Sequence, residues 1–324
     1  MMKAIHIDKF GGPESLVIKS VPIPTPHRGE VLIQIKAFGL NHAETHMRRG
    51  EWAESVPISG IECVGLVTSC PGGEFPVGSK VAALMGGLGR TRSGSYAEYT
   101  VATVENVVGL KTELGWEVLG GLPESYATAW TCLFRNLEVK RGQRLVIRGG
   151  TSGFGVAAVN LAVAAGGKVI ATTRSKARFD KLLALGVEKV EIEGENLSGR
   201  LAESGSVDAV LDLVGNSVVL DSLKLVKRGG RVCIAGFLGG LAPIREFNPL
   251  AEMASGVHLS FFGSFVFGAE GFPVSDVPLQ EIVDDVAAGK FSAKPARVFK
   301  FEEIVEAHRV MDANQANGKL VVVV

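Results

Sequence analysis

The sequence comprises 324 residues, of which 46% are hydrophobic and 21% are charged, a balance typical of a folded α/β protein long enough for two domains. Lysine plus arginine and aspartate plus glutamate each total 34, which gives no indication of binding to nucleic acid or to a membrane surface. We recognise neither a membrane-spanning apolar run nor a signal peptide, and the four cysteines have no paired spacing, so we expect a cytoplasmic protein.

The first 120 residues combine short apolar stretches with turns rich in glycine and proline. This pattern is typical of a β-rich, barrel-like domain. A helix is expected at 125–136, and its Thr128 should face a bound cofactor. We expect strands at 4–7, 16–20, 30–37, 61–68, 80–84 and 94–101.

A βαβ unit is the clearest local pattern in the chain. An apolar run at 145–147 predicts a buried parallel strand, residues 156–165 predict a closely packed helix, and 168–173 predict the next strand. The turn before the helix reads Gly-Gly-Thr-Ser-Gly-Phe-Gly, and backbone N–H groups at such a helix N-terminus favour a pyrophosphate. A serine replaces the middle glycine of the usual pattern, and a turn that only serves close packing is the alternative. The residues expected to bind a dinucleotide are Gly150, Thr151, Ser152, Gly153, Phe154 and Gly155.

The end of the second strand of this unit indicates which dinucleotide is bound. Units that bind NAD usually place Asp or Glu there to hold the ribose 2′-hydroxyl. This chain instead has Arg174 and Ser175, followed by Arg178, and no carboxylate precedes Asp180. An arginine can hold a 2′-phosphate through charge-assisted hydrogen bonds, and basic residues at a helix start suit a bound anion. The sequence therefore favours NADPH over NADH.

Further strands alternate with helices after this unit. The strand at 207–213 ends in Val214 and Gly215, and the strand at 230–236 ends in Phe237 and Leu238. Ligands of open parallel sheets lie beyond the carboxyl ends of the strands, so these four residues should lie near the nicotinamide or its ribose, with simple packing as the alternative for Phe237. The tail should contain an aromatic strand at 260–267, a helix at 277–289, strands at 297–301 and 319–324, and a helix at 302–314.

Several short motifs occur in one order along nearly the whole chain, at 10–14, 39–45, 60–62, 94–99, in the glycine-rich turn and at 316–319. Together they resemble the medium-chain dehydrogenase/reductase superfamily and, within it, the zinc-independent quinone oxidoreductase branch. The resemblance implies an α/β fold with a GroES-like catalytic domain, residues 1–120 completed by 268–324, and a doubly wound Rossmann domain, residues 121–267. It places the active site in the cleft between them. It also implies a homodimer, to which the phenylalanine-rich run 261–267 would contribute a sheet edge.

The resemblance also allows the presence of zinc to be judged from individual residues. Alcohol dehydrogenases of the superfamily hold catalytic zinc through a Cys, the His of a Gly-His-Glu motif, and a further Cys or Asp. This chain has Asn41 and Ile61 at the first two positions and neither Cys nor Asp within 120–129. His42 and His46 are spaced like a metal pair but lack a third ligand. We therefore expect no zinc, and hydride transfer to a quinone or an α,β-unsaturated carbonyl instead of alcohol oxidation.

For the site itself, the resemblance implies that Asn41 and Thr128 lie near the nicotinamide ring or its ribose. It implies in the same way that Asn317 and Lys319 lie near the cofactor. His46 is the candidate catalytic residue because histidine can donate a proton near neutral pH, although solvent could supply that proton equally well. The candidate walls of the substrate pocket are His46, Trp52, Tyr96, Phe265 and Phe267.

Two other functions stay open at this point. Enoyl reductases of biosynthetic pathways use the same branch and the same chemistry, and the loop residues that form the pocket walls separate them poorly from quinone reductases. An NADPH-binding sensor or structural protein without turnover, like the crystallin-like members of the branch, is the third interpretation. The quinone oxidoreductases often have tyrosine at the positions of Glu193 and Trp52, so these departures affect the expected contacts to adenosine and to the quinone.

Overall fold

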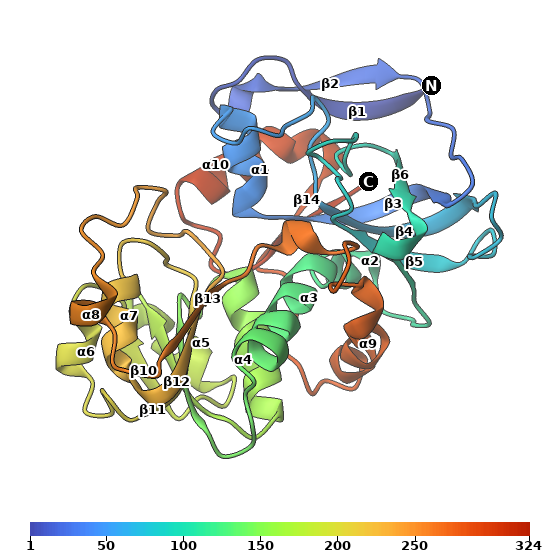
Figure 1. Cartoon of the computed structure of the whole chain (residues 1–324). Helices are drawn as coiled ribbons and strands as arrows, with labels where there is room; N and C mark the ends of the chain where they lie inside the picture. Colours follow the sequence, from blue (N-terminus) through green and yellow to red (C-terminus); the bar gives the residue numbers. More distant parts are fainter. The chain divides into compact units, whose positions relative to one another are not determined.

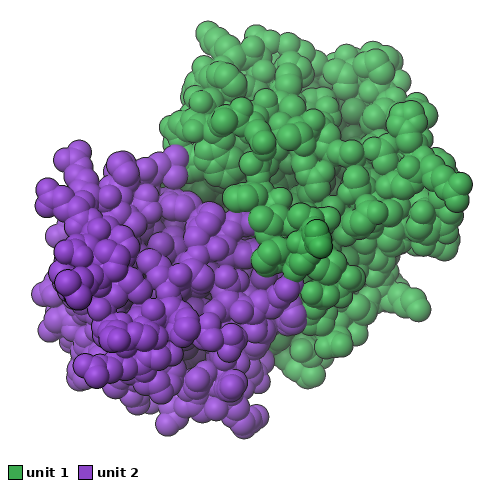
Figure 2. Space-filling view, viewed as in Figure 1, with its two compact units in different colours: residues 1–127, 264–324 green, residues 128–263 purple.

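The computed structural model describes residues 1–324 and divides into two compact units. Unit 1 consists of residues 1–127 and 264–324, and unit 2 consists of residues 128–263 (Figure 2). Both ends of the chain therefore fold into unit 1, whereas unit 2 is one continuous stretch. None of the helices is long and apolar enough to span a bilayer.

A mainly antiparallel sheet forms the centre of unit 1 (Figure 1). The strands of this unit are β1 (Met2–Ile7), β2 (Leu16–Val21), β3 (Glu30–Leu40), β4 (Glu62–Ser69), β5 (Lys80–Leu84), β6 (Tyr99–Thr103), β7 (Val107–Gly109), β14 (Arg297–Lys300) and β15 (Leu320–Val323). The sheet follows the order β14-β15-β3-β4-β5-β7, with β6 paired to β3, while β1 and β2 form a separate pair. Because β15 pairs antiparallel with β3, with Leu320 opposite Leu40, the last residues of the chain complete the sheet.

The helices of unit 1 lie around this sheet. They are α1 (His42–Arg49), α2 (Trp116–Leu119), α9 (Leu279–Ala287) and α10 (Ile304–Asp312), while α3 (Pro123–Thr131) crosses the division between the units. α9 and α10 are amphipathic and bury one apolar face, as expected for helices that cover a sheet. α1 begins directly after β3, so it carries its side chains to the carboxyl end of that central strand.

A buried polar cluster joins α1 to α10 inside unit 1. The fully buried Arg48 guanidinium donates to His308 Nδ1 (3.0 Å) and to Asp312 Oδ2 (2.6 Å). Because arginine can only donate, His308 Nδ1 accepts, and the proton on its Nε2 faces the Tyr96 hydroxyl at 2.9 Å. Burial, followed by the positive charge of Arg48, lowers the pKa of His308 to about 3, so the imidazole is neutral.

Unit 2 is a parallel sheet with helices between its strands (Figure 1). Its strands are β8 (Arg144–Arg148), β9 (Lys168–Thr173), β10 (Lys189–Ile192), β11 (Val207–Asp212), β12 (Val226–Ile234) and β13 (His258–Phe261). Its helices are α4 (Gly153–Ala164), α5 (Phe179–Leu183), α6 (Leu197–Arg200), α7 (Val219–Leu225) and α8 (Pro249–Glu252), and a π-helical turn, Cys132–Asn136, continues α3. The order β10-β9-β8-β11-β12-β13 reverses direction between β8 and β11. This doubly wound arrangement confirms the predicted fold class.

The predicted aromatic strand at 260–267 is wrong in its second half. β13 ends at Phe261, Phe262 N still donates to Ile234 O on β12 (2.9 Å), and Ser264–Val266 form a short 3₁₀ turn in unit 1. Phe267 is buried, and its carbonyl accepts from Asn106 Nδ2 (2.9 Å). A run of aromatic residues suits a buried loop as well as a strand, so the pattern did not distinguish the two.

His308 should make the protein sensitive to mild acid. Its pKa in the folded protein lies below its ordinary value of 6.5, so only the unfolded chain takes up a proton, and stability falls as the pH drops from 6.5 toward 3. Between pH 7 and pH 5 this group should lower the free energy of unfolding by roughly 2 kcal/mol. Urea unfolding at the two pH values measures the loss. The H308Q variant, whose amide can still bridge Arg48 and Tyr96, should lack this component, and an unchanged pH dependence would contradict the assignment.

Candidate functional site

The glycine-rich turn connects the carboxyl end of β8 to the first turn of α4. Ser152 is the N-cap of α4, and its Oγ accepts from Gly155 N (2.9 Å) while donating to Gly149 O (3.0 Å). The serine that replaces the middle glycine therefore closes the turn and caps the helix. The unpaired N–H groups and the positive dipole end at the start of such a helix suit a phosphate.

Gly155 allows α4 to approach the turn closely. A Cβ at this position would lie 2.3 Å from Gly149 O and 2.7 Å from Gly150 C, both of them backbone atoms. Thr151 is also packed tightly, since its buried Oγ1 lies 3.4 Å from Thr173 Oγ1 at the end of β9. This close packing of helix, turn and strand ends is the arrangement that a pyrophosphate-binding turn needs.

The loops after β11 and β12 border the same turn. A Cβ on Gly149 would lie 3.0 Å from Leu238 Cδ1 and 4.0 Å from Val214 Cγ2. Leu238 N donates to Leu213 O (3.0 Å), which holds the two loops together. Unit 2 thus gathers the predicted residues of three strand ends at the carboxyl edge of its sheet, where ligands of doubly wound folds bind. These residues are Gly150, Thr151, Ser152, Gly153, Phe154, Gly155, Val214, Gly215, Phe237 and Leu238.

The end of β9 carries a concentration of positive charge. Arg174 is exposed, Ser175 and Arg178 are half-buried, and Ser175 begins a short 3₁₀ turn, Lys176–Arg178. Burial, followed by the positive charge of Arg178, lowers the pKa of Lys181 on α5, which shows that like charges lie close together here. A dianionic phosphate would relieve this repulsion, whereas a ribose hydroxyl would not.

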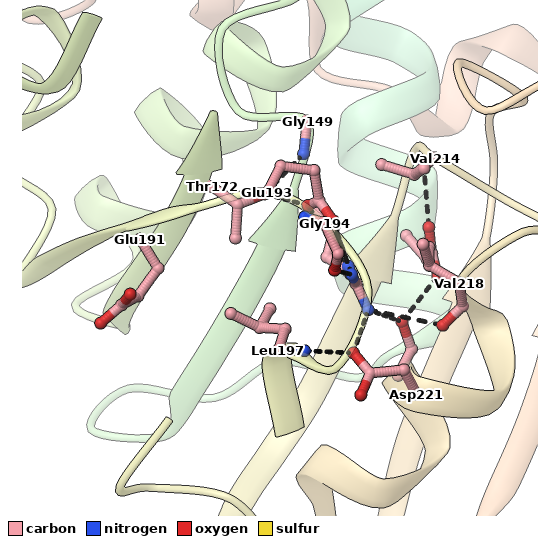
Figure 3. A network of polar contacts seen from close by, with 12 residues as sticks. Gly149, Thr172, Glu191, Glu193, Gly194, Leu197, Val214, Val218 and Asp221 are labelled. Atoms are coloured by element: carbon pink, nitrogen blue, oxygen red, sulfur yellow. Dashed lines mark hydrogen bonds and ion pairs between the residues drawn. The ribbon is translucent and has the colours of Figure 1, made fainter. Parts of the chain in front are cut away.

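A buried arginine directly before the turn, Arg148, organises these loops, and Figure 3 shows its partners Glu193, Gly194 and Asp221. The Arg148 side chain is 0% exposed and donates to Glu193 Oε1 (2.5 Å), Asp221 Oδ2 (2.9 Å) and the Gly194 carbonyl (2.9 Å). It also donates to Ser222 Oγ on α7 (3.1 Å). One guanidinium therefore ties the end of β8 to the segment after β10 and to α7, and its buried charge is balanced by two carboxylates.

The network reaches the loops after β8 and β11 through two further contacts. Thr172 Oγ1 donates to Glu193 and accepts from Gly149 N (3.0 Å), which fixes the first residue of the turn. On the other side, Ser222 Oγ donates to Asp212 Oδ2 (2.7 Å), and Asp212 Oδ1 accepts from the N–H groups of the next loop, Val214 (2.9 Å) and Gly215 (2.8 Å). Burial raises the pKa of Asp212. The sequence analysis did not predict this network. Arg148, a charged residue between an apolar strand and a glycine-rich turn, could have indicated it.

A second polar cluster lies in unit 1, where β3 meets α1. Lys319 Nζ donates to Asn41 Oδ1 (2.6 Å) and to Glu62 Oε1 (2.6 Å), and Asn41 Nδ2 donates to the same Glu62 oxygen (3.0 Å). The Glu62 side chain is 0% exposed and that of Lys319 is 9% exposed. The pairing of β15 with β3 brings Lys319 beside Asn41, since the neighbouring Leu320 is opposite Leu40. Two residues named by the sequence, Asn41 and Lys319, are therefore in contact.

Glu44 is next to this cluster, on α1, and is fully buried. Its carboxyl accepts from Asn41 N (2.8 Å) and Ile61 N (3.2 Å). Burial raises its pKa to about 7, opposed by the charge of Lys319. Gly39 makes room for the cluster, because a Cβ there would lie 2.4 Å from Lys319 Cε and 2.5 Å from Glu62 Oε1.

The residues at the expected zinc positions do not fit a zinc ion. Both polar atoms of the Asn41 side chain are engaged by Lys319 and Glu62, and Ile61 is an aliphatic, buried residue. The ammonium group of Lys319 occupies the neighbourhood of Asn41 with its own positive charge. No group of three or more His, Cys, Asp or Glu side chains in residues 1–324 is close enough to hold a metal. The donor set therefore lacks the ligands that tetrahedral zinc requires.

Three of the five predicted pocket walls lie together in unit 1. The rings of His46 and Trp52 are stacked at 5.8 Å, and the Arg90 guanidinium lies over Trp52 (5.9 Å) and over Phe265 (4.8 Å). His46 Nδ1 is also 2.5 Å from a carboxylate oxygen of Glu51. Arg90 carried no sequence signal, because an arginine in a glycine-rich loop matches no pattern.

Tyr96 and Phe267 do not belong to this group. Tyr96 is fully buried, stacks on Phe38 at 4.7 Å and bonds to His308, while Phe267 is buried beside Asn106. Both are buried in the core of unit 1, so the structure does not bring them together with Trp52 and Phe265. Thr128 is a buried residue of α3, and Asn317 has a left-handed backbone (φ 53°) in the turn before Lys319.

Comparisons with known proteins agree with this architecture. Residues 27–112 match the model of the alcohol dehydrogenase GroES-like domain, which lies within unit 1, and residues 185–322 match that of a zinc-binding dehydrogenase. The quinone oxidoreductase of Mus musculus is 32% identical over 268 residues, which cover 78% of either chain.

Solved structures of other proteins have the same fold. The quinone oxidoreductase from Coxiella burnetii superposes with a TM-score of 0.84 at 28% identity, over 100% of this chain and 99% of that one. A mycobacterial protein solved in complex with NADPH shares the fold, with a TM-score of 0.87 at 24% identity and full coverage of either chain.

The Arg148 network yields a prediction for stability and for cofactor affinity. In the E193Q variant the buried guanidinium loses a charged partner and Gly149 loses part of its anchor, so the free energy of unfolding should fall by about 2 kcal/mol. The affinity for the dinucleotide should fall about fivefold. The matched control is E191Q on β10, whose carboxylate forms a half-exposed pair with Lys189 and should change stability by less than about 0.5 kcal/mol. Denaturant unfolding and cofactor titration of both variants make the comparison, and equal effects would refute the assignment.

Proposed function

Because the chain belongs to the quinone oxidoreductase family and is an oxidoreductase, we propose that it transfers a hydride from NADPH to a quinone or an α,β-unsaturated carbonyl without zinc. The observation that carries the proposal is the contact of Lys319 with Asn41, which stands where zinc enzymes of the superfamily have a metal ligand, and with Glu62, the neighbour of the second such position, Ile61. An ammonium group held there would disfavour a metal ion, and without a metal ion the site has no Lewis acid to polarise an alcohol or a simple ketone.

The choice of NADPH rests on the basic end of β9. Arg174, Ser175 and Arg178 would hold the 2′-phosphate, and the mycobacterial protein of the same fold was solved with NADPH. The first turn of α4 and the glycine-rich turn would hold the pyrophosphate. The remaining contacts would come from Val214, Gly215, Phe237, Leu238, Thr128, Asn41, Asn317 and Lys319.

The acceptor class follows from what these residues can and cannot do. NADPH, when bound, supplies the hydride. The acceptor must then spread the negative charge that develops on it, as a quinone or an enone does through conjugation. The protein's part is to orient the acceptor between rings such as those of Trp52 and Phe265 and to donate to its oxygen. His46 is the candidate donor, held by Glu51 through its Nδ1.

The R174E variant tests the cofactor assignment. Wild-type protein should oxidise NADPH in the presence of a quinone or an enone at a kcat/KM at least tenfold above that for NADH. In R174E the KM for NADPH should rise by about 10- to 100-fold, because charge-assisted bonds to the phosphate are lost and a carboxylate repels it, while NADH should be affected less than threefold. The control is K168E, at the exposed opposite end of β9. Equal loss with both cofactors would contradict the 2′-phosphate role.

We also propose that two copies pair through β13, the edge strand of the sheet in unit 2. Its Phe261 is 53% exposed, and an open edge with an exposed aromatic residue suits pairing with a second copy. Sedimentation velocity should give a dimer for the wild type and a monomer for F261D. V77D, which alters an exposed valine of unit 1, should remain dimeric, and a monomeric wild type would refute the pairing.

A further inference from the structure

One group of side chains in unit 1 contains a positive charge for which the proposed reaction has no use. We call it the Arg90 platform, and it consists of His46, Trp52, Arg90 and Phe265. The guanidinium carbon lies 5.9 Å from the centre of the Trp52 ring and 4.8 Å from that of Phe265, and Trp52 stacks on His46. His46 lies five residues after Asn41, so α1 connects the platform with the cluster around Lys319.

The loop that carries Arg90 is held by backbone hydrogen bonds and by one buried side chain. Leu88 is fully buried and anchors it, Gly89 N donates to Arg92 O (2.9 Å), and Arg90 N donates to Gly87 O (3.0 Å). Gly89 O also accepts from Val56 N (3.4 Å), which attaches the loop to the segment after Trp52. The guanidinium is therefore held in place before any ligand arrives, and a preorganised group loses little freedom on binding.

The Arg90 charge is incompletely satisfied. Its Nη2 pairs with Glu54 Oε2 (2.8 Å), but the Glu54 side chain is 53% exposed, so this pair is weakened by solvent. The Nε–H of Arg90 is buried and has no hydrogen-bond partner. Glu54 shows that this edge of the guanidinium accepts a carboxylate, and a ligand carboxylate could engage Nε and Nη2 together in the bidentate geometry that arginine favours.

We propose that Arg90 is a specificity-determining residue that binds an anionic oxygen group of the substrate, displacing Glu54. The inference rests on the proposed function and narrows its substrate class to quinones or enones that carry a carboxylate or a chemically similar anionic group. The rings of Trp52 and Phe265, which already face the guanidinium, provide apolar surface for the conjugated part of such a molecule. Glu54 acts as an internal competitor that the anionic substrate replaces.

The test compares two acceptors that differ by one charge, 1,4-naphthoquinone and its 2-sulfonate. The measured quantity is the ratio of kcat/KM for the sulfonate to that for the neutral quinone. R90M should lower this ratio at least tenfold, R90K should lower it less, and E54Q should raise it severalfold by removing the competitor. The matched control is R92M, in the same loop, whose guanidinium pairs with Glu30; it loses the same charge and should leave the ratio within twofold.

A binding measurement separates this inference from the proposed function. Quenching of tryptophan fluorescence gives dissociation constants for naphthalene-2-sulfonate and the neutral 2-naphthol. If no acceptor is reduced but the sulfonate binds the wild type at least tenfold more tightly than R90M, Arg90 is the anion site and the reaction is a different one. If quinones are reduced but R90M and R92M give the wild-type ratio, the proposal for Arg90 is wrong. Thermal unfolding of each variant verifies that it is folded.

Discussion

The buried ion pair between Lys319 and Glu62 is the interaction on which the proposed chemistry depends. It joins the C-terminal strand to the strand pair β3–β4 and uses the side chain of Asn41 as a bridge. A buried carboxylate needs a compensating charge, and here the Lys319 ammonium group supplies it. Under the proposed function, the same residues that satisfy Glu62 would leave the site without a Lewis acid and would restrict the acceptors to conjugated ones.

Arg148 has a comparable role in unit 2. Its guanidinium neutralises carboxylates from the segment after β10 and from α7, and through Thr172 and Asp212 the network fixes the backbone of two loops at the carboxyl edge of the sheet. The Glu193 carboxylate faces inward to this arginine, so the segment after β10 is positioned by a buried ion pair. Both units thus position their polar groups with internal charge pairs whose members come from distant parts of the sequence.

The sequence predicted the features that are local. The βαβ unit, its glycine-rich turn and the doubly wound sheet follow from patterns within about thirty residues, and the fold class is confirmed. The Arg148–Glu193 pair spans 45 residues and depends on how β8, β9 and β10 lie side by side, which no local pattern contains. Tyr96 and Phe267 were predicted to line the substrate pocket, whereas both are buried. The sequence pattern of an aromatic residue does not distinguish a core position from a position that lines a pocket. Arg90 acquires its role only from Trp52 and Phe265, which lie far from it in sequence.

The most direct test of the central claim is turnover by protein freed of metal. The chain would be dialysed against a strong chelator, its metal content would be measured, and NADPH oxidation would be followed with quinones, enones, aldehydes and alcohol–ketone pairs. The account predicts that reduction of quinones or enones continues at an unchanged rate with far less than one metal ion per chain. Activity confined to alcohols or ketones that disappears on chelation and returns with zinc would contradict the account. Lys319 would then not take the place of a metal ion.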